Sequence, residues 1–118
     1  MPRKVLAAID DMFFAAKVRA TAEALGVDIR FFRRGDLLVE AAAQTQADLV
    51  LVDLHNQKVD PIELAASLKS LQTGSTPQLL GFFSHVETEL QRAALAAGYD
   101  QVVPRSVFSR DLGKILGE

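Results

Sequence analysis

The stretch DLVLVD at residues 48–53 decides the fold of this chain. Its four central residues are all apolar, whereas a strand with one face in water alternates apolar and polar residues. We therefore expect residues 48–52 to form a strand that is buried on both faces. Such strands are typical of parallel sheets covered by helices on both sides.

Similar short apolar runs alternate along the chain with segments of helical periodicity. Phe14, Val18, Ala22 and Leu25 recur at a spacing of three to four residues, and Gly26 follows as a helix stop. Asp60 and Pro61 suit the cap and the first turn of a later helix. The predicted strands are 5–9, 27–32, 48–52, 78–83 and 101–103, the predicted helices are 12–25, 36–45, 61–71, 87–97 and 106–116, and residues 73–77 are a predicted loop.

The alternation of five strands with five helices predicts one doubly wound α/β domain over residues 1–118. We expect a three-layer sandwich around a five-stranded parallel sheet. Neighbouring residues on a strand point to opposite faces, so the phenylalanine pairs 31–32 and 82–83 are expected to enter the core on both sides.

Composition removes several classes of function. With 49% hydrophobic and 24% charged residues, the chain is typical of a globular protein. It has no cysteine, which excludes a thiolate nucleophile or a zinc site built on cysteines. It has only two histidines, His55 and His85, which leaves little for a metal site built on histidines. The net charge of −2 predicts no nucleic-acid partner, and the small basic patch at Arg30, Arg33 and Arg34 does not change that expectation. No signal peptide or membrane-spanning run is evident, so we expect a cytoplasmic protein without a membrane partner.

Polar side chains follow four of the five predicted strands. Asp10 and Asp11 follow the first strand, Asp53 the third, Ser84 the fourth and Arg105 the fifth. If the strand order is 2-1-3-4-5, the first and third strands are neighbours and their three acids meet in one crevice. Clustered carboxylates repel one another unless a cation neutralises them, and their oxygens suit Mg²⁺. A carboxylate in such a crevice can attack a phosphoryl group.

These residues resemble the receiver domains of two-component response regulators, best known from single-domain chemotaxis regulators. The resemblance covers essentially the whole chain and implies a flavodoxin-like receiver fold with the strand order 2-1-3-4-5. It implies that Asp53 is the phosphoacceptor. Asp11 would bind Mg²⁺ directly, Asp10 through water, and the backbone carbonyl of His55 would complete the metal site together with Asp53. Ser84 and Arg105 would contact the phosphoryl group.

The chain departs from the pattern of this family at several positions. The family has a lysine followed by proline, whereas here Pro104 precedes Arg105. If the prolines are aligned instead, Val103 takes the position of the lysine and no cation is present there. Val102 stands where the family usually has an aromatic switch residue, and residues 12–14 are large and apolar beside the pocket. These departures predict an atypical receiver.

The leading interpretation is a stand-alone receiver-like signalling module of the phosphorelay type. Its partner would be a histidine kinase or another signalling protein, and the chain would be a monomer or a homodimer. The alternative is a pseudo-receiver, which serves as a phosphorylation-independent interaction or dimerisation domain. A small Mg²⁺-dependent phosphatase is a third reading, but we expect no enzyme activity beyond phosphorylation and dephosphorylation of Asp53. Ser84 has a second explanation, because Ser84 and Glu87 fit the S-x-x-E capping box that begins a helix.

Overall fold

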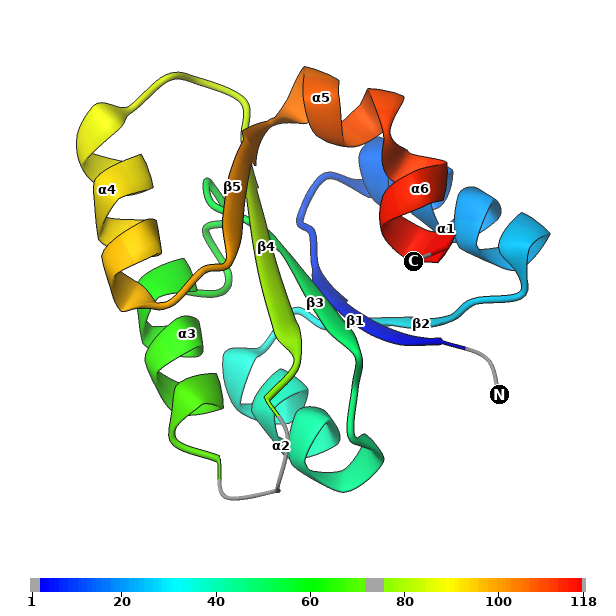
Figure 1. Cartoon of the computed structure of the whole chain (residues 1–118), viewed down its shortest axis with the longest axis horizontal. Helices are drawn as coiled ribbons and strands as arrows, with labels where there is room; N and C mark the ends of the chain where they lie inside the picture. Colours follow the sequence, from blue (N-terminus) through cyan, green and yellow to red (C-terminus); the bar gives the residue numbers. More distant parts are fainter. Residues whose placement is uncertain (1–2, 72–75, 118) are drawn as a thin grey trace.

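The computed structural model describes residues 3–71 and 76–117, which contain a five-stranded parallel sheet in the order β2-β1-β3-β4-β5. The predicted strand order and the doubly wound, flavodoxin-like architecture are therefore confirmed (Figure 1). In chain order the elements are β1 (Lys4–Ala8), α1 (Met12–Leu25), β2 (Asp28–Phe31), α2 (Gly35–Thr45), β3 (Leu49–Asp53), α3 (Pro61–Lys69), β4 (Gln78–Phe83), α4 (Thr88–Ala97), β5 (Gln101–Pro104), α5 (Arg105–Arg110) and α6 (Leu112–Gly117).

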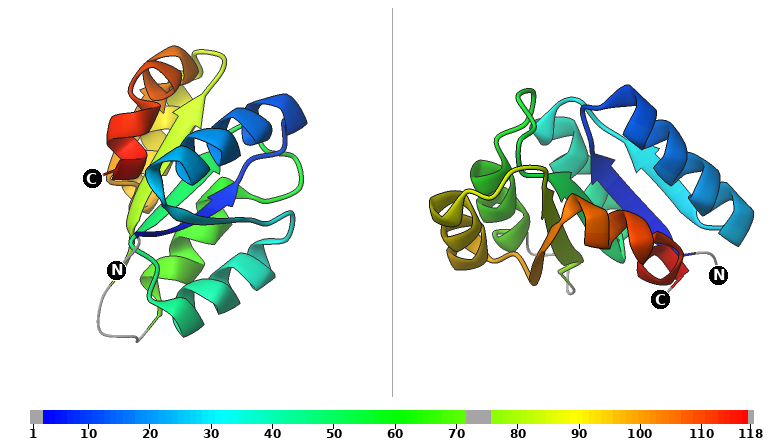
Figure 2. Two further views of the ribbon diagram at one scale, coloured as in Figure 1. Left: turned by 90° about the vertical axis from the view of Figure 1, so that its right-hand side faces the viewer. Right: turned by 90° about the horizontal axis from the view of Figure 1, so that it is seen from above.

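Helices cover both faces of the sheet, as Figures 1 and 2 show, with α2, α3 and α4 on one face and α1, α5 and α6 on the other. Each face has its own apolar cluster, one around Leu38 and Leu64 and the other around Phe108. Phe31 packs against the second cluster and Phe32 against the first, so these neighbours point to opposite faces as predicted.

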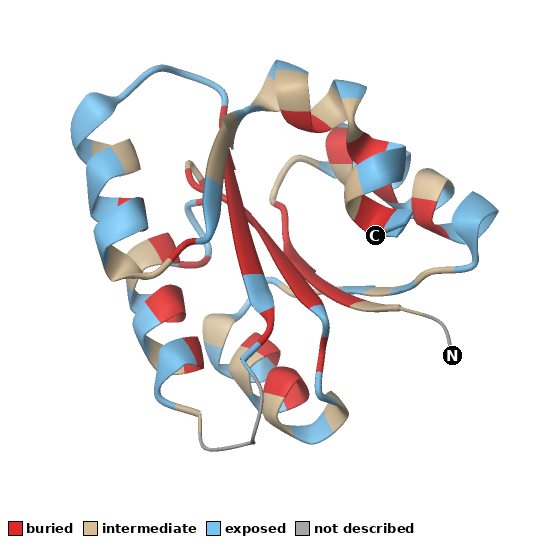
Figure 3. Ribbon diagram, viewed as in Figure 1, coloured by how far each residue is buried: buried red, intermediate tan, exposed pale blue. Residues whose placement is uncertain are grey.

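The central strands carry most of the burial in the sheet (Figure 3). All five residues of β3 are buried, which confirms the prediction from its unbroken apolar run. The edge strands β2 and β5 are only partly covered, because each has a strand neighbour on one side alone. The strands that lead to the predicted acids and Ser84, namely β1, β3 and β4, are therefore the most buried ones.

Local signals set the helix ends where the chain was expected to turn. The carboxylate of Asp11 accepts hydrogen bonds from the first turn of α1, and Gly26 ends that helix at φ 70°, a left-handed conformation that glycine adopts without strain. The carboxylate of Asp60 caps α3 in the same way, as predicted. No helix within the described ranges combines the length and apolar character needed to cross a membrane.

Two predictions about helices were wrong. The helix expected over residues 106–116 is interrupted at Asp111, which leaves helical geometry at φ −99° and ψ 15°. The Asp111 carboxylate binds the neighbouring Arg110 guanidinium, and Asp111 and Gly113 both have low helix propensity. The capping box was also wrong, because α4 begins at Thr88 with Glu87 as its N-cap, so Ser84 lies outside the helix. The predicted loop at 73–77 falls mostly outside the described residues.

Candidate functional site at the carboxyl ends of the strands

The acids of the candidate site lie on two neighbouring strands. β1 and β3 pair in parallel with Ala8 opposite Val52, so Asp10 and Asp53 follow at the same edge of the sheet. Asp10 is close enough to Asp53 for its negative charge to help raise the pKa of that carboxyl. The sequence-based expectation that these acids share one crevice is consistent with this placement.

Asp53 is the buried member of the group, with 8% of its surface exposed. Its Oδ1 accepts a hydrogen bond of 2.9 Å from the backbone N–H of His55. Burial raises the pKa of the Asp53 carboxyl, while the His55 N–H and the positive charge of Arg105 act in the opposite direction. Among the described residues, no hydrogen-bond donor contacts Oδ2 of Asp53, the other oxygen of this carboxylate.

Asp11 uses both of its carboxylate oxygens within the protein. Oδ1 accepts the backbone N–H groups of Phe13 and Phe14, at 2.9 and 3.1 Å, and thereby caps α1. Oδ2 accepts a hydrogen bond of 3.1 Å from Nη2 of Arg105. The hydrogen bonds from Phe14 and Arg105 hold the pKa of Asp11 below its usual range.

The structure decides between the two alignments that the sequence left open. The guanidinium of Arg105 reaches the site and pairs with Asp11. Val103 instead packs partly buried against the apolar cluster on the α1 face of the sheet. The cation at the end of β5 is therefore Arg105.

The loop after β3 is held by a residue that the sequence analysis did not identify. Asn56 is 9% exposed, and its Nδ2 donates a hydrogen bond of 3.1 Å to the carbonyl of Ala8 at the end of β1. Its Oδ1 accepts the backbone N–H groups of Lys58 and Val59, at 2.7 and 3.0 Å. Asn56 thus ties the Asp53 loop to the strand that leads to Asp10. An asparagine in a loop carries no sequence signal of its own for this role.

The remaining predicted residues lie at the rim. The ring of His55 contacts that of His85, with centroids 5.2 Å apart, and His55 Nε2 lies 3.3 Å from the His85 carbonyl oxygen. Ser84 is exposed, and no hydrogen bond joins its side chain to another described residue. The structure therefore pairs Asp11 with Arg105, places Asp10 and Arg105 within electrostatic reach of Asp53, and leaves the Ser84 side chain exposed.

The ligand types at this site suit Mg²⁺, but one of the acids is already engaged within the protein. Asp10, Asp11 and Asp53 offer carboxylate oxygens, which Mg²⁺ prefers. Over residues 3–71 and 76–117, however, no three histidine or acidic side chains lie close enough together to hold a metal ion. Asp11 is engaged by its own helix and by Arg105, so a metal ion would have to displace at least one of these contacts.

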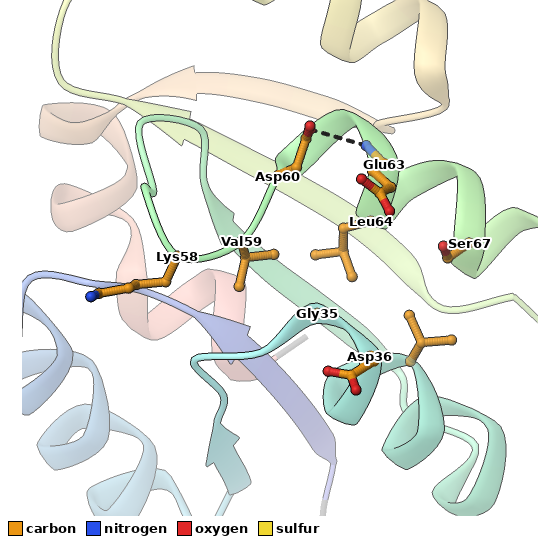
Figure 4. Close-up of a pocket in the computed structure, with 9 residues that line it drawn as sticks. Gly35, Asp36, Lys58, Val59, Asp60, Glu63, Leu64 and Ser67 are labelled. Carbon is orange, nitrogen blue, oxygen red and sulfur yellow. Dashed lines mark hydrogen bonds between the residues drawn. The ribbon is translucent and has the colours of Figure 1, made fainter.

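Several cavities lie near the loops at the carboxyl ends of the strands. A hollow of about 340 Å³ opens beside Asp10 and is bordered by Met12, Arg19 and Arg33. A larger one of about 540 Å³ lies between α2 and the start of α3 and is lined by none of the predicted site residues (Figure 4). Asp60 lines the larger cavity, but one oxygen of its carboxylate is occupied as the cap of α3.

No protein-family model matches the chain, and no curated protein matches it. Solved structures do match it in fold. A CheY-like receiver domain protein from Methanospirillum hungatei JF-1 has a TM-score of 0.82 at 18% identity, over 98% of this chain and 91% of its own. The chemotaxis response regulator CheY4 of Vibrio cholerae has a TM-score of 0.83 at 17% identity, over 98% and 97%.

A third match is the receiver domain of a sensor histidine kinase from Pseudomonas aeruginosa PAO1, with a TM-score of 0.79 at 16% identity over all of both chains. That structure holds a magnesium ion coordinated in its active site cleft. The matches agree with the strand order and with the helices on both faces of the sheet. This chain therefore has the CheY-like receiver fold of the response regulators.

Proposed function

We propose that the chain is a receiver-type signalling module in which Asp53 accepts a phosphoryl group. The position of Asp53 carries this proposal. It ends the most buried strand of the sheet, one of its oxygens is anchored by the His55 N–H, and the other has no donor among the described residues. A carboxylate that served only to end the strand would gain by turning into solvent, because burial opposes its charge.

The proposed reaction is a single transfer of a phosphoryl group to Asp53. Its free oxygen forms a bond to phosphorus while the P–N bond of a phosphohistidine, or the P–O bond of acetyl phosphate, breaks and the donor leaves. Arg105 is close enough to lower the pKa of Asp53, so its charge also favours the phosphorylated, more negative state of the site. No other turnover is part of the proposal.

The signal would leave through a protein contact. The proposed partners are a histidine kinase or another signalling protein in the cytoplasm, with the chain acting as a monomer or a homodimer. The receiver fold supports this reading because signalling domains of that fold are the proteins whose structures match.

Phosphorylation of Asp53 is tested by incubating the chain with acetyl phosphate and Mg²⁺ and measuring the intact mass. We expect an adduct of one phosphoryl group on the wild type and none on Asp53→Asn. Asp28→Asn removes an exposed carboxylate on β2 and serves as the matched control that should still be labelled. An unlabelled wild type, or a label that survives in Asp53→Asn, refutes the assignment.

The Arg105–Asp11 pair favours a second candidate function. If the acidic site is held closed by its own arginine, the chain can act as a pseudo-receiver whose contacts do not depend on phosphorylation. Homodimerisation is the one such contact that can be measured with the purified chain and no partner protein. Sedimentation velocity would then give the same self-association for wild type and Asp53→Asn, with or without beryllofluoride. Association that beryllofluoride changes in the wild type alone supports the first function, and a monomer at every concentration removes the dimerisation reading.

A further inference from the structure

Arg105 and Asp11 form an ion pair between two residues that are far apart in the sequence. Their residues are 94 positions apart, and the pair joins the start of α5 to the start of α1. The other arginine–carboxylate pairs among the described residues link neighbours in sequence: Arg34–Asp36, Arg92–Glu89 and Arg110–Asp111. The Arg105–Asp11 pair therefore exists only because the fold places the carboxyl ends of the parallel strands β1 and β5 at the same end of the sheet.

Arg105 is held from a second side by an aromatic ring. Its guanidinium carbon lies 4.0 Å from the ring centroid of Phe14, within the range of a cation–π contact. Phe14 is itself buried, with its ring 5.3 Å from that of Phe82 and 5.7 Å from that of Phe108. The ring that the guanidinium contacts is thus part of the packed core, and this contact holds the positive charge of Arg105 in place.

The same pair leaves Asp11 with little capacity for another ligand. One of its oxygens is committed to two backbone N–H groups of α1 and the other to Arg105. The positive charge of Arg105 also acts on Asp53, where it offsets part of the rise in pKa that burial causes. A divalent cation entering the site meets both an occupied ligand and a fixed like charge.

We infer that Arg105 is a built-in counter-ion that stands in for the divalent cation and weakens the binding of Mg²⁺ between Asp10, Asp11 and Asp53. The inference concerns the same site as the proposed function and deepens it, but it does not require that Asp53 be phosphorylated. Guanidinium and metal ion neutralise the same carboxylates, so the binding of one opposes the binding of the other.

Arginine suits this role better than lysine. The guanidinium is planar, always charged and more weakly hydrated than an ammonium group, and it stacks on an aromatic face while donating to a carboxylate. An arginine side chain that leaves the ion pair for water therefore gains less hydration free energy than a lysine side chain would gain. These properties explain physically why an arginine at position 105 suits the role of counter-ion.

Binding of Mn²⁺, followed by its EPR signal, tests the inference without any phosphorylation. We expect Arg105→Gln, which keeps a polar side chain and removes its charge, to bind Mn²⁺ at least about tenfold more tightly than the wild type. A tenfold change corresponds to about 1.4 kcal/mol. Arg105→Lys keeps a charge that is more easily displaced, so its affinity should lie between the two. Competition by Mg²⁺ in the same titration extends the result to the magnesium ion.

Control variants test whether the gain in Mn²⁺ affinity arises from the Arg105–Asp11 pair. Arg110→Gln removes another arginine of α5, whose partner is the adjacent Asp111, and should leave the Mn²⁺ affinity unchanged. Adding Asp11→Asn to Arg105→Gln should abolish the gain, because the released ligand is then missing. Circular dichroism and thermal unfolding confirm that each variant is folded.

An Arg105→Gln variant that binds Mn²⁺ no more tightly than the wild type overturns the inference. A gain that persists in the double variant with Asp11→Asn overturns it as well, since the released carboxylate is then irrelevant. Failure of the acetyl phosphate experiment would refute the role of Asp53 and leave these metal affinities as they are. The two proposals can therefore fail separately.

Discussion

Replacing Asn56 by alanine removes one hydrogen bond that fastens the Asp53 loop to β1 and two that hold the loop itself in shape. Two of the groups left behind, the carbonyl of Ala8 and the N–H of Val59, belong to buried residues. A buried polar group that loses its partner costs about 1–3 kcal/mol. The N–H of Lys58 belongs to an exposed residue and can bond to water, so it adds little.

We therefore expect Asn56→Ala to lower the free energy of unfolding by about 2–4 kcal/mol. That is a large part of the roughly 5–15 kcal/mol by which domains are stable, and it lowers the melting temperature by roughly 10 °C. Urea unfolding followed by circular dichroism measures the change. Gln57→Ala alters the exposed neighbour and is the matched control, with an expected effect within about 0.5 kcal/mol.

A second variant separates the donor from the acceptor of Asn56. Asn56→Asp keeps an acceptor for the two N–H groups but removes the donor to Ala8 and adds a buried carboxyl group. Burial raises the pKa of this new carboxyl in the folded state, so the variant is most stable below roughly pH 4 and loses stability as the pH rises. The penalty of Asn56→Ala stays constant over that range. A loss below about 0.5 kcal/mol for Asn56→Ala would refute the role given to this side chain.

Three further outcomes follow from the packing and electrostatics of the site. Because burial raises the pKa of Asp53, its ionisation opposes folding, so Asp53→Asn should melt higher than the wild type at pH 7. The difference should close as the pH falls through roughly pH 4, and a gap that does not depend on pH would contradict this reasoning. Phe108→Ala should cost about 3–5 kcal/mol in urea unfolding, since this fully buried ring stacks 4.6 Å from that of Phe82, and a loss under about 2 kcal/mol would mean that the core refills the space. Tyr99→Phe removes the hydrogen bond of 2.8 Å from the buried hydroxyl to the Pro61 carbonyl and should cost about 1 kcal/mol in the same assay, whereas an unchanged midpoint would show that the bond adds no net stability.

Much of the fold could be predicted because its signals are local. The bounds of α1 and β4 agree with the expected ranges, and Asp60 caps α3 as its position before Pro61 indicates. Periodicity reports which face of an element is buried, and a cap acts within one turn, so neither needs knowledge of the rest of the chain. Where local signals were weak, the prediction was wrong: the helix expected over 106–116 is interrupted at Asp111, and Ser84 does not cap α4, although the bounds of α4 agree with the expected range to within one residue.

The candidate site could be located but not arranged. The strand order brings the ends of β1 and β3 together, so the acids that follow them are neighbours whatever their side chains do. The bonds that those side chains make could not be predicted. Asn56 could not be identified as the link to Ala8, because an asparagine makes such loop bonds in many settings.

The sequence by itself determined the alternation of strands and helices, the doubly wound sheet and the edge at which Asp10, Asp11 and Asp53 gather. Only the tertiary structure decided that Arg105, and not Val103, faces these acids and that Asp11 is its partner. The physical reason is range. Burial and capping act between residues a few positions apart, whereas the Arg105–Asp11 pair forms across 94 positions and depends on how the ends of β1 and β5 and the buried ring of Phe14 meet in space.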